Sequence, residues 1–351
     1  MEIAENSPWR GVNIVVEDPS LRSTTGSPEV LPVVADEKIC FLALASIRGV
    51  GYWTLAHIAK SGTKFSTVLG FQDGTDAIAL MKKHGARLES KDGGDWQQVR
   101  ERALDRARML FDELSDQGIK LLFASDLEFP RSLQDLADAP AWLFVQGDEK
   151  ILSMPSIAAV GTRTPSDDGM WLCRFAGLCL SHWKAPTVSG LANGIDQLIH
   201  EMSIRASVPT VAVLGTGIFS EYPKGSRALR ERIVDCGGAV ITEYLPTDSY
   251  SGENFVRRNR IQAALAKVLI PVEWAQKSGT AHTVRYAASM NRPIAFLRLP
   301  DWEEKRTSFA NGIAKNARTF TIPGEGEDFR QFISDALSGG KPPPLGQLKL
   351  I

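Results

Sequence analysis

The sequence predicts an α/β protein with a doubly wound, mainly parallel sheet, preceded by a small all-α domain. Short β-rich runs each end near a glycine, and spans of roughly ten or more residues with a helical apolar pattern separate them. Ahead of these runs, residues 37–118 carry apolar side chains at helical spacing. Parallel neighbours need long crossover connections, and the crossover helices cover both faces of the sheet.

The candidate strands of this sheet are short apolar runs. They lie at 121–123, 141–145, 156–160, 187–189, 210–214, 238–242, 268–272 and 293–297. The first two are separated by Pro130 and Pro140, and we expect them to join the sheet that follows. Apolar residues between Phe329 and Leu337 predict one last amphipathic helix.

The helical domain is predicted from two short helices on either side of Gly49-Val50-Gly51. Their apolar faces run from Phe41 to Ile47 and from Leu55 to Ala59, and a longer helix follows from about Asp95 to Ser115. A Gly-Val-Gly turn between two helices is typical of helix-hairpin-helix (SAM-like) domains. This turn can offer its backbone N–H groups to a DNA phosphate. The alternative is that Trp53 and Leu55 simply pack the hairpin.

The chain is therefore divided into a flexible arm over 1–36, the helical domain over 37–118, the sheet domain over 119–338 and a tail over 339–351. The formal net charge of −1 creates no field that attracts polyanions, so any nucleic-acid site must be a local patch. The cysteines lack zinc-ligand spacing, and no apolar run approaches the roughly 20 residues that a membrane span needs. We expect a reduced, cytoplasmic protein without metal, cofactor or membrane segment.

Three predicted strands are followed at once by glycine and small polar residues. These turns are Gly161-Thr162-Arg163, the segment from Ser189 to Gly194, and Gly215-Thr216-Gly217. In open α/β sheets the ligand binds outside the carboxyl ends of the strands, where backbone N–H groups and helix N-termini attract anions. Each turn by itself also fits a plain strand-to-helix connection. Three in succession predict an anion-binding rim along one edge of the sheet.

The segment 252–261 places an aromatic ring and three guanidinium groups close together in an otherwise neutral chain. Its central residues are Asn254, Phe255, Arg257, Arg258, Asn259 and Arg260. A base stacked on an aromatic ring, with arginines at the phosphates, is the usual arrangement for binding single strands. The alternative is a solvated charged face of a helix.

These residues, taken together, resemble the DNA-processing protein A family (DprA, also called Smf). The motifs occur here in the family's order, although Thr162 stands where serine is usual. They are Gly161-Thr162-Arg163, Ser189 to Asp196 with His200, Ala212 to Gly217 with Tyr222-Pro223, Thr242 to Pro246, Asn254 to Ile261, and Glu273 with Ser278-Gly279-Thr280.

The resemblance implies a Rossmann-like domain that binds single-stranded DNA without being an enzyme. It also implies a homodimer and, in many members, a RecA-type recombinase partner during DNA transformation or repair. Asp196 and Asn259 would buttress the site by hydrogen bonding. The residues expected at the nucleic acid are Arg163, Ser189, Gly190, Gly194, Gly215, Gly217, Lys224, Asn254, Phe255, Arg257, Arg258, Asn259, Arg260, Ser278, Gly279 and Thr280.

Two other functions stay open at this point. Related Rossmann-like proteins hydrolyse nucleoside monophosphates with a Pro-Gly-Gly-x-Gly-Thr turn and a glutamate, and the nearest stretch here, Ser278-Gly279-Thr280, lacks the Pro-Gly-Gly. Glu243 and Glu273 are the carboxylates available for such chemistry, and the alternative is that both cap helices or pair with arginines. The third interpretation is a nucleotide-binding sensor of a defence system.

Overall fold

The computed structural model describes residues 36–88, 95–303, 310 and 312–339, and it shows two compact units. The first unit runs up to Phe111 and includes Ser125–Leu127, and the second holds Asp112–Ala124 and the chain from Glu128 onward. The predicted arm, apart from Asp36, and the tail, apart from Gly339, lie outside the described residues. The predicted domain boundaries stay a prediction.

The first unit is helical, as the sequence predicts. Its helices are α1 (Glu37–Ser46), α2 (Tyr52–Lys60), α3 (Phe65–Gly70), α4 (Gly74–Lys83) and α5 (Trp96–Asp116), which crosses into the second unit. The turn between α1 and α2 contains Gly49 at φ +91°, a conformation that favours glycine. The Gly49 carbonyl accepts a hydrogen bond from the Arg87 N–H at 2.8 Å. Neither α3 nor α4 was foreseen from the sequence.

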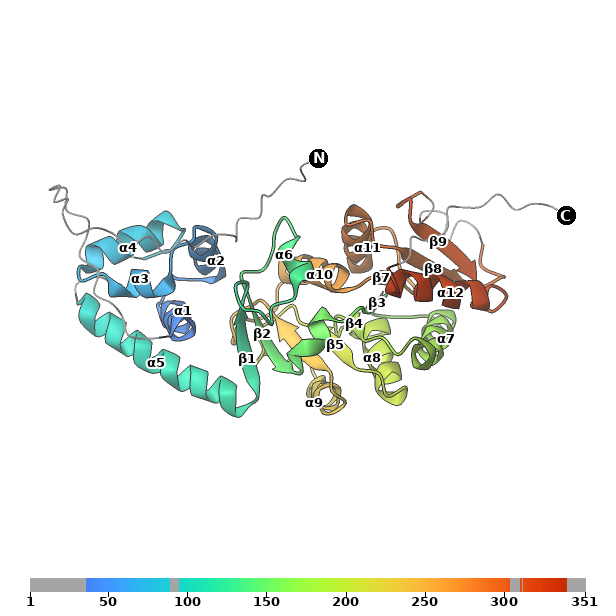
Figure 1. Cartoon of the computed structure of the whole chain (residues 1–351), viewed down its shortest axis with the longest axis horizontal. Coiled ribbons are helices and arrows are strands. Elements are labelled where there is room, and N and C mark those ends of the chain that lie inside the picture. The colour runs from blue at the N-terminus through green and yellow to red at the C-terminus, as the bar shows by residue number, and fades with distance from the viewer. Residues whose placement is uncertain (1–35, 89–94, 304–309, 311, 340–351) are drawn as a thin grey trace. The chain divides into compact units, whose positions relative to one another are not determined.

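The second unit is built on a nine-stranded sheet in the order β1-β2-β6-β5-β4-β3-β7-β8-β9 (Figure 1). The strands are β1 (Ile119–Phe123), β2 (Trp142–Gly147), β3 (Ile157–Val160), β4 (Thr187–Ser189), β5 (Thr210–Val213), β6 (Ala239–Thr242), β7 (Val268–Pro271), β8 (Ile294–Arg298) and β9 (Ala317–Thr321). The pairs β1–β2 and β2–β6 are antiparallel, and the remaining pairs are parallel. The predicted doubly wound, mainly parallel sheet is therefore confirmed.

Helices cover both faces of this sheet, with α10 and α11 on one side and α7, α8 and α12 on the other (Figure 1). They are α6 (Arg131–Gln134), α7 (Asp167–Trp183), α8 (Ile195–Arg205), α9 (Arg227–Asp235), α10 (Gly252–Leu265), α11 (Gly279–Ser289) and α12 (Gly326–Leu337), and a 3-10 helix spans Glu149–Ser153. Alternate residues of β3 enter opposite cores: Ala158 and Val160 pack with Ile261 of α10, whereas Ile157 and Ala159 pack with Leu172 of α7.

The order of the strands reverses direction at β3. From β3 the chain moves outward through β4, β5 and β6, and it then returns to pair β7 on the other side of β3. Crevices that bind ligands in open α/β sheets form at such a switch point, outside the carboxyl ends of the strands. The segments that follow β3 and β7 are therefore the first place to look for a site.

Two details of the second unit bear on the sequence predictions. The edge strand β9 was not foreseen, whereas α12 matches the predicted last helix. None of the helices in the described part of the chain is long and apolar enough to cross a membrane.

Candidate functional site

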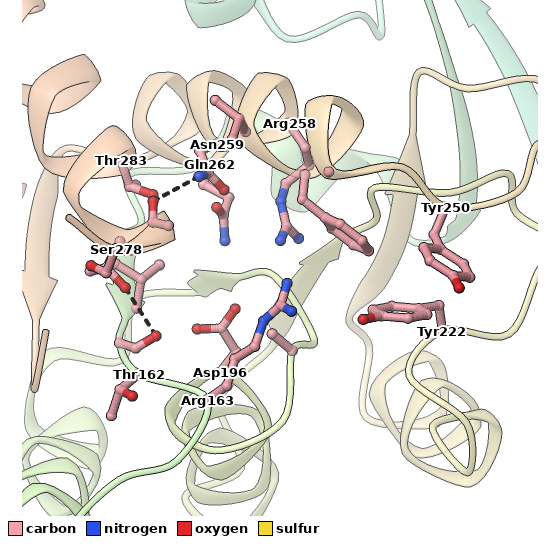
Figure 2. Close-up of a pocket in the computed structure, with 18 residues that line it drawn as sticks. Thr162, Arg163, Asp196, Tyr222, Tyr250, Arg258, Asn259, Gln262, Ser278 and Thr283 are labelled. Carbon is pink, nitrogen blue, oxygen red and sulfur yellow. Dashed lines mark hydrogen bonds between the residues drawn. The ribbon is translucent and has the colours of Figure 1, made fainter. Parts of the chain in front are cut away.

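A cavity of about 590 Å³ lies at the switch point of the sheet (Figure 2). Its wall comes from the loop after β3, the start of α8 with the segment before it, one face of α10, the start of α11, and two tyrosines. The lining residues are Val160, Gly161, Thr162, Arg163, Ala192, Asp196, Tyr222, Tyr250, Gly252, Phe255, Val256, Arg258, Asn259, Gln262, Ser278, Gly279, Thr280 and Thr283. Seven of them belong to the predicted site: Arg163, Phe255, Arg258, Asn259, Ser278, Gly279 and Thr280.

Arg163 and Phe255 meet in the wall of this cavity. The guanidinium carbon of exposed Arg163 lies 5.3 Å from the centroid of the half-buried Phe255 ring. This distance is within the range of a cation–π contact, which holds the cation over the face of the ring. The fold thus brings together a charge and an aromatic ring that are 92 positions apart in the sequence.

Phe255 is the first of three aromatic rings that form a row with Tyr222 and Tyr250. The Tyr222 ring lies 4.9 Å from Phe255 and 4.9 Å from Tyr250, and the two tyrosines are stacked at 29°. Tyr250 is 63% exposed, so this end of the row is open to solvent. Sequence reasoning gave neither tyrosine a role, although Tyr222-Pro223 was part of a recognised motif. Tyr250 lies in a segment without a motif, and its place in the row depends on the fold.

Arg258 lies inside the fold behind Phe255, with only 4% of the residue exposed. Its Nη1 donates to the Gly190 carbonyl at 2.7 Å and also to the Val213 carbonyl. Burial lowers the pKa of Arg258 to about 10, and nearby Asp196 opposes that shift. Burial likewise raises the pKa of Asp196, and Arg258 and backbone N–H groups oppose it. The buried charges of Arg258 and Asp196 thus compensate each other electrostatically, and the Arg258 guanidinium already binds two carbonyl oxygens.

Arg257 and Arg260 point away from the cavity into an ion-pair network. Arg260 donates to both carboxylate oxygens of Glu243, at 2.6 and 2.8 Å, and to the Asp138 carbonyl at 2.8 Å. Arg257 pairs with Asp138 at 3.0 Å and lies 3.3 Å from Glu243. The structure does not bring these two guanidinium groups to the cavity with Arg163. They anchor α10 to the loop before β2.

Seven other predicted residues do not line the cavity: Ser189, Gly190, Gly194, Gly215, Gly217, Lys224 and Asn254. The Ser189 hydroxyl donates to the Ala159 carbonyl at 2.7 Å. A methyl group on Gly215 would lie 2.7 Å from Cε1 of Phe255, and one on Gly190 would collide with the Arg258 guanidinium. These two glycines therefore make room for the side chains that form the wall. Lys224 is exposed beyond Tyr222.

The N-terminus of α11 forms another part of the cavity wall, through Ser278, Gly279 and Thr280. The Thr280 hydroxyl donates to the Gly161 carbonyl at 3.0 Å, and the Asn259 amide donates to the Gly279 carbonyl at 3.0 Å. These bonds fix the first turn of α11 to β3 and α10. A helix N-terminus presents backbone N–H groups and a partial positive charge to an anion.

The two carboxylates of the hydrolase interpretation are both engaged elsewhere. Glu243 is 1% exposed and pairs with Arg260, and Glu273 accepts hydrogen bonds from the N–H and the hydroxyl of Ser166, both at 2.8 Å. Ser166 is the N-cap of α7. Both contacts agree with the alternative in which these glutamates pair with arginines or support helix ends.

The family model of DNA recombination-mediator protein A matches residues 120–328. Protein Smf of Synechocystis sp. is 34% identical over 198 residues, which are 55% of this chain and 50% of that protein. DNA processing protein DprA of Streptococcus pneumoniae is 33% identical over 166 residues, 47% of this chain and 58% of that protein. The match thus spans about half the length of these curated relatives.

Two solved structures share the fold. The crystal structure of Streptococcus pneumoniae DprA covers 84% of this chain and 98% of its own, with a TM-score of 0.59 and 23% identity. The Helicobacter pylori DprA structure, whose description concerns the single-stranded DNA binding mode of that protein, covers 64% of this chain and 97% of its own. Its TM-score is 0.53 and its identity 25%.

Proposed function

Since this chain belongs to the DNA recombination-mediator protein A family, we propose that its second unit binds single-stranded DNA at the cavity beside β3 and β7. The observation that carries the proposal is the Arg163 guanidinium over the Phe255 ring in the cavity wall, with Tyr222 next in the row. In a chain with a net charge of −1, this local combination of charge and rings is what can attract an unpaired strand.

Each part of the site has a physical role in this proposal. Arg163 contacts the phosphate backbone, and the rings of Phe255, Tyr222 and Tyr250 offer stacking surfaces to bases. The first turn of α11, with Ser278, supplies backbone N–H groups to a further phosphate. The remaining predicted residues act in support: Lys224 extends the basic path, whereas Ser189, Gly190, Gly194, Gly215, Gly217, Asn254, Arg257, Arg258, Asn259, Arg260, Gly279 and Thr280 shape the site.

The wider role that we propose is that of a DNA-binding accessory protein in recombination, not an enzyme. It would protect single strands and present them to a RecA-type recombinase, and it would act as a homodimer. The family membership supports this role, as does the placement of Glu243 and Glu273 in ion-pair and helix-end contacts.

Fluorescence anisotropy with a labelled oligothymidine of about 20 nucleotides tests the binding site. We expect micromolar or tighter binding, with a log–log salt slope of roughly −2 to −4 if about three to five phosphates are neutralised. Arg163→Ala should weaken binding to every sequence alike and make the slope shallower by about 0.7, because one phosphate contact is lost. The matched control is Arg205→Ala. Arg205 is exposed and lies at the C-terminal end of α8, whereas the cavity lies at the N-terminal end of that helix. Equal affinity of the Arg163→Ala variant and the parent would refute the proposed site.

The volume of the cavity also suits a small nucleotide, since ligand pockets of about 300–1,000 Å³ hold small molecules. Competition separates the two functions. A mononucleotide at millimolar concentration that fully displaces the labelled strand would favour the sensor interpretation, and release of the base from it would favour the hydrolase. Displacement by an unlabelled oligothymidine alone supports DNA as the ligand.

A further inference from the structure

A tryptophan is exposed on the first turn of α2, in the helical unit. Of the two side chains considered as packing for the hairpin, Leu55 is fully buried, whereas Trp53 is 50% exposed. The Trp53 ring lies 6.3 Å from the His57 ring, and Lys60 follows one turn later on the same face of α2. A single exposed apolar side chain needs no explanation by itself. The residues around Trp53 therefore decide what this ring can bind.

The end of α4 lies beside this face of α2. The Nδ1 atom of His57 lies 3.2 Å from the His84 carbonyl oxygen, and the Arg87 N–H donates to the Gly49 carbonyl at 2.8 Å. Burial lowers the pKa of His84, and the nearby charges of Lys83 and His57 lower it further. These contacts join two segments that are distant in the sequence into one surface of the helical unit.

This surface, which we call the Trp53 surface, is cationic. No Asp or Glu occurs at positions 39–72 or 77–88, which supply both of its segments. Arg48, Lys83 and Arg87 form no ion pair with any residue that the structure describes. In a chain with a net charge of −1, such a local excess of positive charge attracts a polyanion. The exposed cations of the surface are Arg48, Lys60, Lys83 and Arg87.

We propose that the Trp53 surface is a second binding site for an unpaired nucleic-acid strand, in which Trp53 stacks on a base and the surrounding cations contact the phosphates. A ring alone would suit any apolar partner, and positive charge alone would suit any polyanion. The two together fit a polymer that carries flat rings between anionic groups. This inference goes beyond the proposed function, because no residue of the second unit takes part in it.

The test is Trp53→Ala in the full chain, made in an Arg163→Ala background in which the proposed cavity site is weakened. Fluorescence anisotropy compares labelled oligothymidine with the same sugar–phosphate chain without bases. We expect about tenfold weaker binding of oligothymidine, because a base loses its stacking partner, and unchanged binding of the base-free chain. Trp53→Phe keeps a ring and should recover most of the affinity. Arg87→Ala should weaken both ligands alike, because it removes a phosphate contact.

The matched control is Trp171→Ala. Trp171 is a tryptophan of similar exposure, 43%, but it lies on α7 and does not line the cavity. Its replacement should leave both affinities unchanged. Cooperative thermal unfolding of every variant well above the assay temperature ensures that a lost affinity reflects the surface and not the fold.

The outcomes separate this inference from the proposed function. Parent-like binding of oligothymidine after Trp53→Ala, or an equal loss for both ligands, would overturn stacking on Trp53, while a loss caused by Arg163→Ala alone would leave the cavity site standing. A loss caused by Trp53→Ala alone would support the Trp53 surface and refute the cavity site. If polyglutamate of equal charge bound the Arg163→Ala protein more tightly than oligothymidine, the partner would be an acidic peptide and the inference would fail.

Discussion

Replacing Arg258 with methionine should destabilise the second unit far more than replacing Arg163, although both arginines line the same cavity. Arg258 is 4% exposed, and its Nη1 bonds the Gly190 and Val213 carbonyls, whereas Arg163 is exposed. Methionine retains the buried volume and removes the charge and the donors. The variant therefore isolates what the guanidinium does for the fold.

The size of the stability loss follows from the Asp196 carboxylate, which stays in the interior when Arg258 is removed. Asp196, 5% exposed, would lose the cation that lowers its pKa and would keep its backbone hydrogen bonds. Removing Arg258 leaves the Asp196 charge buried without the cation that compensates it, and an uncompensated buried charge costs about 3 to 5 kcal/mol. The carboxyl limits this penalty by taking up a proton. From the ordinary pKa of 3.8 that costs about 4 kcal/mol at pH 7, and this is the upper limit because burial already raises the pKa of Asp196 in the parent.

Urea unfolding at pH 7 measures this loss directly, and thermal unfolding should show a decrease of roughly 6 to 20 °C. Arg163→Met is the matched control and should stay within about 0.5 kcal/mol of the parent. The Asp196 pKa rises further in the Arg258→Met variant. The stability deficit of this variant should therefore shrink as the pH falls, and it should be smallest below pH 3.8, where the carboxyl is mostly protonated in both the folded and the unfolded state. A deficit below about 1 kcal/mol at pH 7 would refute the assignment of Arg258 to the fold.

Three further predictions follow. Gly215→Ala should displace the Phe255 ring, because the new methyl group would lie 2.7 Å from its Cε1; weaker binding of oligothymidine in an anisotropy titration would show this, and parent-like affinity would contradict it. Tyr250→Ala should weaken strand binding by about 1 to 3 kcal/mol if bases stack on the row, with the melting temperature unchanged because Tyr250 is 63% exposed. Burial lowers the pKa of His200 from 6.5 to about 3, so the unfolded chain binds the extra proton and this group removes stability as the pH falls from about 6.5 to about 3. His200→Asn should flatten that part of the pH profile of urea unfolding, and an unchanged profile would show that His200 takes up its proton as readily in the folded as in the unfolded chain.

Most of the sheet was predictable because each strand except β9 is a short apolar run that ends near a turn residue. The strand β9, with the sequence ARTFT, lies at an edge and is mostly half-buried, so it lacks the apolar run. The short helix α3 depends on a tertiary contact: the Glu37 carboxylate accepts from the Phe65 and Ser66 N–H groups at 2.9 and 3.2 Å. A partner almost thirty residues away leaves no local signal in the sequence.

The candidate site was predicted in part. The meeting of Arg163 with Phe255 follows from the rule that strand ends gather at one edge of the sheet. The placement of Arg257 and Arg260 could not be read from a charge run, because it depends on Asp138 and Glu243 from other parts of the chain. Helical spacing did offer a signal for Gln262, which lies on the same face of α10 as Phe255 and Arg258.

The two sides of α10 give this helix a recognisable mutational signature. Phe255, Asn259 and Gln262 face the cavity, while Arg257 and Arg260 face the anchoring carboxylates. Selection for ligand binding and selection for abundance would thus act on different positions of one helix. A saturation library of α10 sorted separately for the two traits should give sensitivity profiles that each repeat every three to four residues, shifted by about half a turn.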